Sequence, residues 1–344
     1  MKTVPRSGAD SASLSSLANL PVALDAMGGD LGPLEMVAGA GDATRAHGIP
    51  VLLVGRSGDL GDTAGADVLA CTEVIGMQED PVRAVRQKKD SSVVRAAEAV
   101  RDRRACAFVS AGSTGAALAA ATLRLGRIPG AVRPAVVAPL PVPGRVPHVL
   151  VDAGANVECP AGLLVQLARM GSVFSAVRYS VSSPRVALLS NGEESSKGTP
   201  EIREAHRQLL ETPGINFIGN IEGREILDGD YDVVVTDGFT GNVVLKLLEG
   251  TLRFFMRSLL DAFGSSPEVQ EAARVLLPAL TPLADEMDPE ATGGAMLLGV
   301  DGVCVISHGS STRKAIMNAI RVAHEMVDLD LVARIKESIE PGHR

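Results

Sequence analysis

The chain has 344 residues, 46% of them hydrophobic, and a mean hydropathy of +0.19, which excludes an intrinsically disordered protein and is sufficient for a large core. Its formal charge of −8 argues against a general nucleic-acid binder, which needs a basic face. The chain has no Trp and few other aromatic residues, whereas Ala, Val, Leu and Gly are abundant. This balance is typical of helices packed on a parallel sheet.

The N-terminal residues 1–20 are rich in Ser and lack the continuous apolar region of a signal peptide, so we expect a flexible tail. We expect a single domain over residues 21–340, which includes a helical segment at about 250–290. No apolar run reaches the length of a membrane-spanning helix. The cysteines are widely spaced and form no metal-binding pattern, which predicts reduced, buried thiols in a cytosolic protein. They are Cys71, Cys106, Cys159 and Cys304.

Six segments share one pattern, in which a short apolar run ends in a polar turn that contains glycine or small residues. They are VALDAMGGD (22–30), AFVSAGSTGA (107–116), HVLVDAGAN (148–156), VALLSNGEESSKG (186–198), DVVVTDGFTGN (232–242) and VCVISHGSS (303–311). Segments with helical periodicity alternate with them, for example 91–104 and a helix that begins at Ser311 or Thr312. The alternation predicts a mainly parallel α/β sheet, in which ligands bind beyond the carboxyl ends of the strands.

The first two turns allow both a structural and a functional interpretation. DAMGGD, with Asp25 and Asp30 around two glycines, suits a tight turn before an acidic helix start or an open loop facing a substrate. SAGSTGA offers backbone N–H groups and two hydroxyls, which suit an anion site or ordinary helix capping. It is not the G-x-G-x-x-G dinucleotide fingerprint.

The turn NGEESSKGT resembles a phosphate-binding P-loop in which the final Gly and Lys have changed places. Two consecutive glutamates would also repel a polyphosphate, so ATP and GTP are excluded. Lys197 provides a single positive charge, which suits a single phosphate; the alternative is a solvated loop lysine. In VVVTDGFTGNVVLKLLEG, Asp237 and Asn242 suit either a helix cap or one wall of a binding site.

Three other features have alternatives. His308 in SHGSS lacks the nucleophile of a catalytic triad, which favours hydrogen bonding or a structural contact. The basic stretches 81–92 and 101–104 suit a solvated face or a docking site for an acidic partner. The helical, Phe-rich stretch at 250–290 suits core packing, a dimer interface or membrane contact.

The sequence resembles the bacterial phosphate acyltransferase family, which transfers acyl groups from acyl carrier protein to phosphate, from about Val22 to about Ile335. The resemblance rests on DAMGGD, EDPVRAVRQKKDSS, GRIPG, DAGANVE, NFIGNIEGREIL, DVVVTDGFTGNVVLKLLEG and GGAMLLGVDGVCVISHGSS, in this order. Two positions depart from the family pattern: Ser113, where Asn is usual, and Ala153, where Val is common.

The resemblance implies an α/β/α sandwich like that of phosphate acetyltransferase and the isocitrate and isopropylmalate dehydrogenases, with a protruding helical segment. It implies transfer of a long-chain fatty acyl group from acyl carrier protein to inorganic phosphate, for phosphatidic acid and phospholipid synthesis, without a cofactor or metal. It also implies a cytoplasmic homodimer that associates peripherally with the inner face of the cell membrane, where a glycerol-3-phosphate acyltransferase uses the acyl phosphate.

Phosphate is already a nucleophile and a thioester has a good leaving group, so the reaction needs an anion site, a donor to the oxyanion and close placement. We expect Lys197 and Asn242 to be catalytic. The expected substrate-binding residues are Asp25, Gly28, Gly29, Ser113, Thr114, Asn156, Asp237, Gly238 and His308. We expect Lys246, a full turn into its helix, to be supporting or on the surface.

Because acyl carrier protein is acidic, the basic stretch gains weight as its docking site, formed by Arg83, Arg86, Lys88 and Lys89. Phe254 and Phe255 are the candidates for membrane contact. The alternatives are a phosphate acetyltransferase-like enzyme that uses acyl-CoA and a non-catalytic scaffold that binds acyl chains or membrane. A dehydrogenase would need a nicotinamide site and usually a metal-binding Asp cluster, and neither signature is present.

Overall fold

The computed structural model describes residues 17–288 and 290–339, which form two compact units. Unit 1 comprises the described residues up to Pro134 and from Gly293 onward, and unit 2 comprises Ala135–Thr292. Most of the tail expected at 1–20 lies outside the described residues, and its flexibility stays a prediction. Ala18, within the described part, accepts a hydrogen bond from His324 Nε2 at 3.0 Å.

The strands of unit 1 are parallel apart from the last pair, β11 and β10, which is antiparallel. Their order is β3 (Asp67–Ala70), β2 (Val51–Gly55), β1 (Val22–Asp25), β4 (Ala107–Ser110), β11 (Val303–Ile306) and β10 (Ala295–Leu298). Strands β1, β2, β4 and β11 are buried along their whole length, because helices cover both of their faces.

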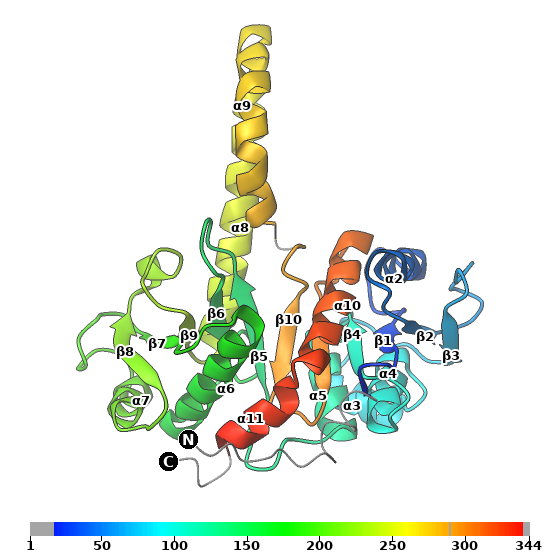
Figure 1. Cartoon of the computed structure of the whole chain (residues 1–344), viewed down its shortest axis with the longest axis horizontal. Coiled ribbons are helices and arrows are strands. Elements are labelled where there is room, and N and C mark those ends of the chain that lie inside the picture. The colour runs from blue at the N-terminus through cyan, green and yellow to red at the C-terminus, as the bar shows by residue number, and fades with distance from the viewer. Residues whose placement is uncertain (1–16, 289, 340–344) are drawn as a thin grey trace, which may run out of the picture. The chain divides into compact units, whose positions relative to one another are not determined.

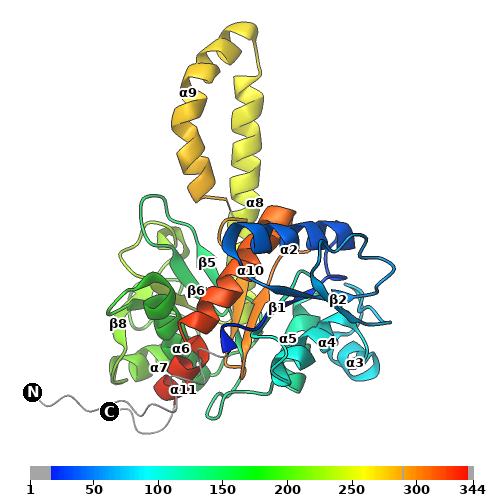
Figure 2. The same cartoon turned by 45° about the vertical axis from the view of Figure 1, so that its right-hand side comes forward.

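The helices of unit 1 are α2 (Pro33–His47), α3 (Pro81–Gln87), α4 (Ser92–Arg101), α5 (Thr114–Arg124), α10 (Arg313–Asp328) and α11 (Leu331–Ile339). Helices α2 and α10 pack together on one face of the strands, and α3, α4 and α5 cover the other (Figure 2). The helices expected at 91–104 and after Ser311 are α4, which follows Ser91, and α10, which follows Thr312.

Unit 2 has the strand order β5 (Ala135–Leu140), β6 (His148–Val151), β9 (Val233–Val235), β7 (Arg185–Leu189) and β8 (Asn216–Ile221). Only the β5–β6 pair is antiparallel. The helices are α6 (Ala161–Tyr179), α7 (Pro200–Leu210), the 3₁₀ turn η1 (Gly223–Glu225), α8 (Gly238–Phe263) and α9 (Pro267–Glu286). The six apolar segments of the sequence are β1, β4, β6, β7, β9 and β11, which confirms the expected mainly parallel α/β fold.

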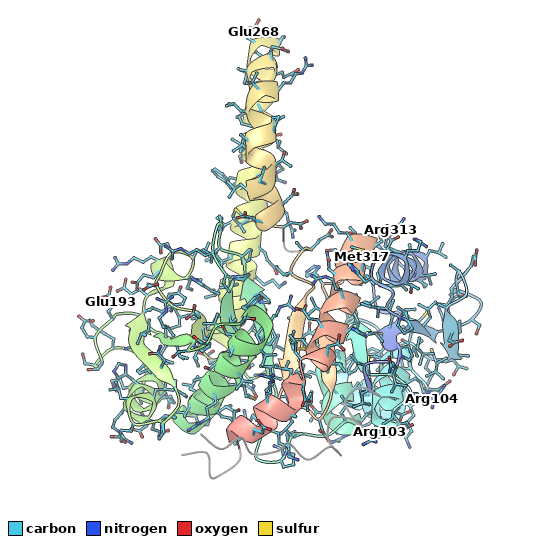
Figure 3. The ribbon with its side chains drawn as sticks, in the orientation of Figure 1. Arg103, Arg104, Glu193, Glu268, Arg313 and Met317 are labelled. Carbon is cyan, nitrogen blue, oxygen red and sulfur yellow. The ribbon has the colours of Figure 1, made fainter. Side chains whose placement is uncertain are left out.

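Helices α8 and α9 form an antiparallel hairpin that projects away from the strands of unit 2 (Figure 1). Glu268, at the start of α9, lies at the far end of this hairpin (Figure 3). Only Gly238 and Gly241 of α8 are buried, so the helix keeps an apolar surface in contact with solvent. Among residues 17–288 and 290–339, no helix is both long and apolar enough to span a bilayer.

Candidate active site

Three neighbouring parallel strands of unit 2 end at the same edge. Val151 of β6 and Leu188 of β7 both pair with Val235 of β9. The segments that follow these strands are therefore adjacent at the carboxyl edge, where parallel α/β sheets bind ligands. Asp152 follows β6, the loop of Lys197 follows β7, and Asp237 with Asn242 follows β9.

The turn after β6 is organised by Asp152, which is completely buried. Its carboxylate accepts hydrogen bonds from the N–H groups of Val136, Gly154, Ala155 and Asn156 at 2.8–3.0 Å. It also accepts one from Asn156 Nδ2 at 2.8 Å. Five donors offset the desolvation of one carboxylate and fix the backbone of the whole turn.

The start of α8 rests on this turn through two glycines. A Cβ on Gly241 would lie 1.8 Å from the carbonyl oxygen of Asp152, and a Cβ on Gly238 would lie 2.7 Å from that of Asn156. The Gly238 N–H donates to the same Asn156 oxygen at 2.7 Å. Any side chain at these positions would push the helix away, so glycine permits the close approach. Gly238 is thus buried against the turn, and its expected contact with substrate stays a prediction.

Asn242 lies in the first turns of α8 and is exposed. A Cβ on Gly154 would lie 3.7–3.9 Å from the Asn242 side chain, so the amide group lies over the turn of Asp152. Asp237 is the N-cap of α8 and accepts from the N–H and the hydroxyl of Thr240, both at 2.8 Å. Lys246 is exposed and pairs with Glu249 at 2.8 Å, as expected for a surface residue.

Lys197 lies in an exposed loop between β7 and α7. Its N–H donates to the Glu194 carbonyl oxygen at 3.0 Å, and its Cγ lies 2.6 Å from the position of a Cβ on Gly192. Glycine at position 192 thus leaves room for the aliphatic part of the lysine. Within the described part of the chain, the Lys197 ammonium has no ion-pair or hydrogen-bond partner, so it is available to an anion. Figure 3 labels Glu193, another exposed residue of this loop.

In unit 1, the ends of β1, β4 and β11 are also adjacent, because Ser110 pairs with both Asp25 and Ile306. The Asp25 carboxylate is 2% exposed and accepts from the Ser110 hydroxyl at 2.7 Å and the Met27 N–H at 3.3 Å. Burial raises the pKa of Asp25 above its ordinary value, although hydrogen bonds from Ser92, Ser110 and Met27 act in the opposite direction.

A small cleft opens beside this carboxylate, between the turn after β1 and the starts of α4 and α5. Asp25, Gly28, Ser92, Gly112 and Ser113 are among its lining residues. A Cβ on Gly28 would lie 2.6 Å from the Gly112 nitrogen, so glycine allows the two turns to touch.

Ser113 and Thr114 mark the start of α5. Ser113 is the N-cap, and its hydroxyl accepts from the Ala116 N–H at 3.4 Å. Thr114 is exposed. The capping interpretation therefore describes Ser113, and anion binding at this helix start stays a prediction.

His308 lies in the exposed turn after β11. The Ser310 N–H donates to His308 Nδ1 at 3.1 Å, which leaves Nε2 as the nitrogen that carries the proton of the neutral ring. The neighbouring Gly309 carbonyl accepts from the Asp30 N–H at 2.8 Å. This contact brings the turn of His308 next to the DAMGGD turn, where Gly29 is half-buried.

The residues expected at the docking site lie in and just after α3. Arg83, Arg86 and Lys89 are exposed, and none has an ion-pair partner among the described residues. Lys88 differs from them, because its ammonium donates to Val74 O at 2.8 Å and to Glu79 Oε1 at 2.7 Å.

The thiols are unsuited to nucleophilic catalysis. All four cysteines lie among the described residues, where they are buried and form no disulfide bond. Burial raises the pKa of Cys71 and of Cys106 to about 11 and raises that of Cys304 further, so these three are protonated at neutral pH.

Sequence reasoning missed the buried groups that support the turns, namely Asp152, Ser110 and Ser92. Asp152 had a usable signal, because it directly follows the apolar strand β6. Asp25 has a similar place, as the last residue of the apolar strand β1. The two serines had none, since their hydrogen bonds to Asp25 depend on residues far away in the sequence.

A family model described as "Fatty acid synthesis protein" matches residues 20–334 of the chain. The phosphate acyltransferase of Pelotomaculum thermopropionicum is 45% identical over 328 residues, which cover 93% of this chain and 95% of that relative. The phosphate acyltransferase of Elusimicrobium minutum is 44% identical and covers 92% and 95%.

Solved structures share the fold at low sequence identity. A phosphotransacetylase from Streptococcus pyogenes has a TM-score of 0.62 at 16% identity, covering 93% of this chain and 99% of its own. A branched-chain phosphotransacylase from Enterococcus faecalis V583 has a TM-score of 0.59 at 14% identity, covering 89% and 99%. A 4-hydroxythreonine-4-phosphate dehydrogenase from Klebsiella pneumoniae has a TM-score of 0.53 at 14% identity, covering 90% and 99%.

The fold thus places the molecule in the class of α/β proteins built like phosphotransacetylases and related dehydrogenases. The sequence matches are more specific, since they extend over nearly the whole chain at 44–45% identity. The chain belongs to the phosphate acyltransferase family and is an acyltransferase.

Proposed function

We propose that this protein transfers a long-chain fatty acyl group from acyl carrier protein to inorganic phosphate, and that the acyl phosphate serves phosphatidic acid and phospholipid synthesis. The observation that carries the proposal is the 45% identity, over 93% of the chain, with a relative named phosphate acyltransferase. The donor-rich edge of unit 2 supports it, because an acceptor phosphate needs an uncommitted cation and oriented donors.

In the proposed reaction, a phosphate oxygen attacks the thioester carbonyl carbon. The carbonyl π electrons move to oxygen, and the resulting tetrahedral intermediate collapses as the carbon–sulfur bond breaks. The carrier thiolate leaves, and the proton of hydrogen phosphate ends on this sulfur. The products are acyl phosphate and the free carrier thiol, so atoms and charge balance without an oxidant or a covalent enzyme intermediate.

Lys197 and Asn242 have the properties that this step requires. The Lys197 ammonium is exposed without a described partner, and it neutralises phosphate or the oxyanion. The exposed Asn242 amide, over the turn of Gly154, donates to the same centre. Asp237 fixes the start of α8, and Asn156, whose Nδ2 donates to Asp152, shapes the turn beside it.

The unit 1 residues expected to bind substrate fall into two roles. Asp25, Gly28 and Gly29 shape the turn after β1, whereas Ser113, Thr114 and His308 present polar groups at the rim. We assign these residues to holding the substrate and not to the chemical step. The reason is that the buried Asp25 carboxylate already accepts hydrogen bonds from Ser110 and Met27.

Docking of the acidic carrier is assigned to α3 and the residues that follow it. Arg83 and Arg86 are three residues apart in one helix and therefore lie on one face. Together with Lys89 they form an exposed positive patch, while Lys88 supports it by fastening the loop at Val74 and Glu79. Electrostatic docking of this kind acts mainly on the association rate.

The α8–α9 hairpin is assigned to peripheral membrane contact. The protein as a whole is assigned to a homodimer, as the resemblance implies. Phe254 and Phe255 are 63% and 61% exposed, and Val275 of α9 is 77% exposed. Arg253 and Arg257 beside the phenylalanines are exposed and favour an anionic surface. Loss of binding to anionic vesicles by Phe254→Asp/Phe255→Asp, with fold and oligomeric state retained, supports the assignment. Unchanged binding contradicts it.

The function is tested by incubating the purified protein with palmitoyl-acyl carrier protein and measuring release of the free carrier with and without phosphate. We expect release that depends on phosphate and is faster than with palmitoyl-CoA at equal concentration. Faster turnover of palmitoyl-CoA favours a phosphate acetyltransferase-like enzyme. No turnover of either donor favours a binding scaffold.

A further inference from the structure

The loop that carries Lys197 is held by a buried asparagine from the neighbouring strand. Asn220 lies in β8, which pairs in parallel with β7, and is 7% exposed. Its Nδ2 donates to the Glu194 carbonyl oxygen at 3.0 Å. The same oxygen accepts from the Lys197 N–H at 3.0 Å. One carbonyl group therefore connects Asn220 directly to the turn that presents Lys197.

His206 of α7 fixes the orientation of this asparagine. Its Nδ1 lies 2.9 Å from Asn220 Oδ1. A carbonyl can only accept, so Asn220 turns its NH₂ group to Glu194 and its oxygen to His206. An amide oxygen also only accepts, so His206 Nδ1 carries a proton. The His206 ring packs edge-on against Phe217 of β8, with centroids 5.1 Å apart.

The opposite side of the loop is closed by a hydrogen bond between two of its own residues. The Gly198 N–H donates to Asn191 Oδ1 at 2.9 Å, and Gly198 has a φ of +88°, which favours glycine. The Lys197 ammonium has no described partner that would orient it. The direction of this side chain therefore depends on where the backbone between Asn191 and Gly198 is held.

We propose that Asn220 and His206 are positioning residues for Lys197. Through the Glu194 carbonyl they hold the loop so that the ammonium faces the edge where β6, β9 and β7 end. The inference rests on the proposed function, in which Lys197 contacts phosphate or the developing oxyanion. It goes beyond that function because Asn220 and His206 act through the position of the loop and do not themselves contact the substrate.

The first test measures the loop itself and does not depend on activity. Hydrogen exchange of the peptide spanning residues 190–199 is compared in Asn220→Leu, His206→Leu, His206→Asn and the unaltered protein. We expect about tenfold faster exchange in the two leucine variants. Asn220→Leu removes the hydrogen bond to the Glu194 carbonyl, and His206→Leu removes the hydrogen bond that orients Asn220. His206→Asn places an amide N–H near the position of Nδ1 and should restore slow exchange.

The matched control is Arg207→Ala on the same helix. Arg207 pairs with Glu204 and Glu211 at the surface and does not touch the loop. Its exchange at 190–199 should equal that of the unaltered protein. Unchanged exchange in both leucine variants overturns the proposal, whatever the activity.

The second test is a double-mutant cycle on kcat. Asn220→Leu should lower kcat by about 10²-fold when Lys197 is present, because a small displacement of a reacting group has this effect. In a Lys197→Ala background the same change should lower kcat less than about twofold. An equal loss in both backgrounds shows a structural role only and overturns the proposal.

Two results separate this proposal from the function on which it rests. If Lys197→Ala retains full turnover, the catalytic role of Lys197 is wrong and so is the role of Asn220 in catalysis. If the unaltered protein shows no phosphate-dependent release of carrier, the proposed function is overturned. Hydrogen exchange then still decides whether Asn220 and His206 hold the loop.

Discussion

The strand ends of units 1 and 2 follow the same sequence pattern but offer different chemistry. At the end of β1, Asp25 is buried and receives hydrogen bonds from Ser110 and Met27. At the edge of unit 2, the buried carboxylate is Asp152. The exposed Asn242 lies over its turn, and Lys197 is exposed in the loop after β7. In both units a buried Asp organises the turns, but the exposed nitrogen donors of the proposed catalytic pair lie in unit 2.

This difference teaches that a polar residue at a strand end can support a turn instead of facing a ligand, as Asp25 and Asp152 do. Glycine contributes to this role, because a residue without a Cβ lets a neighbouring backbone pack against the turn that holds the carboxylate. Gly28 contacts the Gly112 backbone in unit 1, and Gly241 contacts the Asp152 carbonyl in unit 2. The groups that remain uncovered are the ones available to a ligand.

The largest expected effect comes from closing the space at Gly241. In Gly241→Ala, the new Cβ would lie 1.8 Å from the Asp152 carbonyl oxygen, so the start of α8 must move. We expect a loss of at least about 3 kcal/mol in the free energy of unfolding, measured by urea denaturation. Gly250→Ala on the same helix meets nothing within 4 Å and should be stabilising by about 0.5–1 kcal/mol. Equal stability of the two variants would contradict the close packing.

Next in size is the loss of the uncommitted donors of unit 2. Lys197→Ala and Asn242→Ala should each lower kcat by about 10²-fold, or about 3 kcal/mol in transition-state stabilisation. The control is Lys246→Ala, whose ammonium pairs with Glu249 on the exposed side of α8 and should retain full turnover. Steady-state kinetics with acyl carrier protein and phosphate measure all three. Turnover within a few-fold of the unaltered protein for both site variants would remove the assignment.

A smaller effect is expected at the docking patch of unit 1. Arg86→Glu should raise the KM for acyl carrier protein about fivefold at low salt and less at high salt, because salt screens exposed charges. Arg207→Glu makes the same charge change on exposed α7 and should leave this KM unchanged. A KM that is insensitive to both Arg86→Glu and salt would count against electrostatic docking.

The smallest effect is on the pH dependence of stability. It distinguishes the buried carboxylate of Asp25 from that of Asp42, which pairs with Arg313. Burial raises the pKa of Asp25, so its contribution to stability is present below the ordinary value of 3.8 and is lost as pH rises through the raised value. Asp25→Asn removes this titration. Relative to the unaltered protein, the variant should therefore gain unfolding free energy as pH rises above about 3.8.

Asp42 provides the control of opposite sign in the same unit. A hydrogen bond from Arg313 lowers its pKa, so its contribution is present above the ordinary value of 3.8 and is lost as pH falls through the lowered value. Asp42→Asn should therefore cost stability at neutral pH and not at the lowest pH. Urea unfolding across pH 2 to 7 measures both trends relative to the unaltered protein. If the unfolding free energy of both variants changed in the same direction with rising pH, the opposite pKa shifts of Asp25 and Asp42 would be contradicted.

Much of the fold was predictable because local patterns determine it. The apolar runs before polar turns identified β1, β4, β6, β7, β9 and β11. Helical periodicity at 91–104 and after Ser311 or Thr312 identified α4 and α10. The antiparallel pairs β5–β6 and β10–β11 were not predicted, since pairing depends on partners elsewhere in the chain.

The sequence was sufficient to predict the turns that form the candidate site. It was not sufficient to predict the buried residues that hold these turns in place. Lys197 stood out because a single positive charge followed a strand end that contains glycine. Asn220 and His206 did not stand out, because one reads as an ordinary strand residue and the other as an ordinary helix residue. Their hydrogen bond joins β8 to α7, and only the folded chain brings Glu194 to the same point.

The central claim is that phosphate itself accepts the acyl group at the edge of unit 2. The most direct measurement traps acyl phosphate with hydroxylamine and quantifies palmitoyl hydroxamate formed from palmitoyl-acyl carrier protein. We expect hydroxamate above the enzyme-free background, which hydroxylamine forms from the thioester itself, and this excess depends strictly on phosphate. It falls about 10²-fold in Lys197→Ala but not in Lys246→Ala. Free palmitate as the product, or an excess over background that is equal without phosphate, would contradict the account.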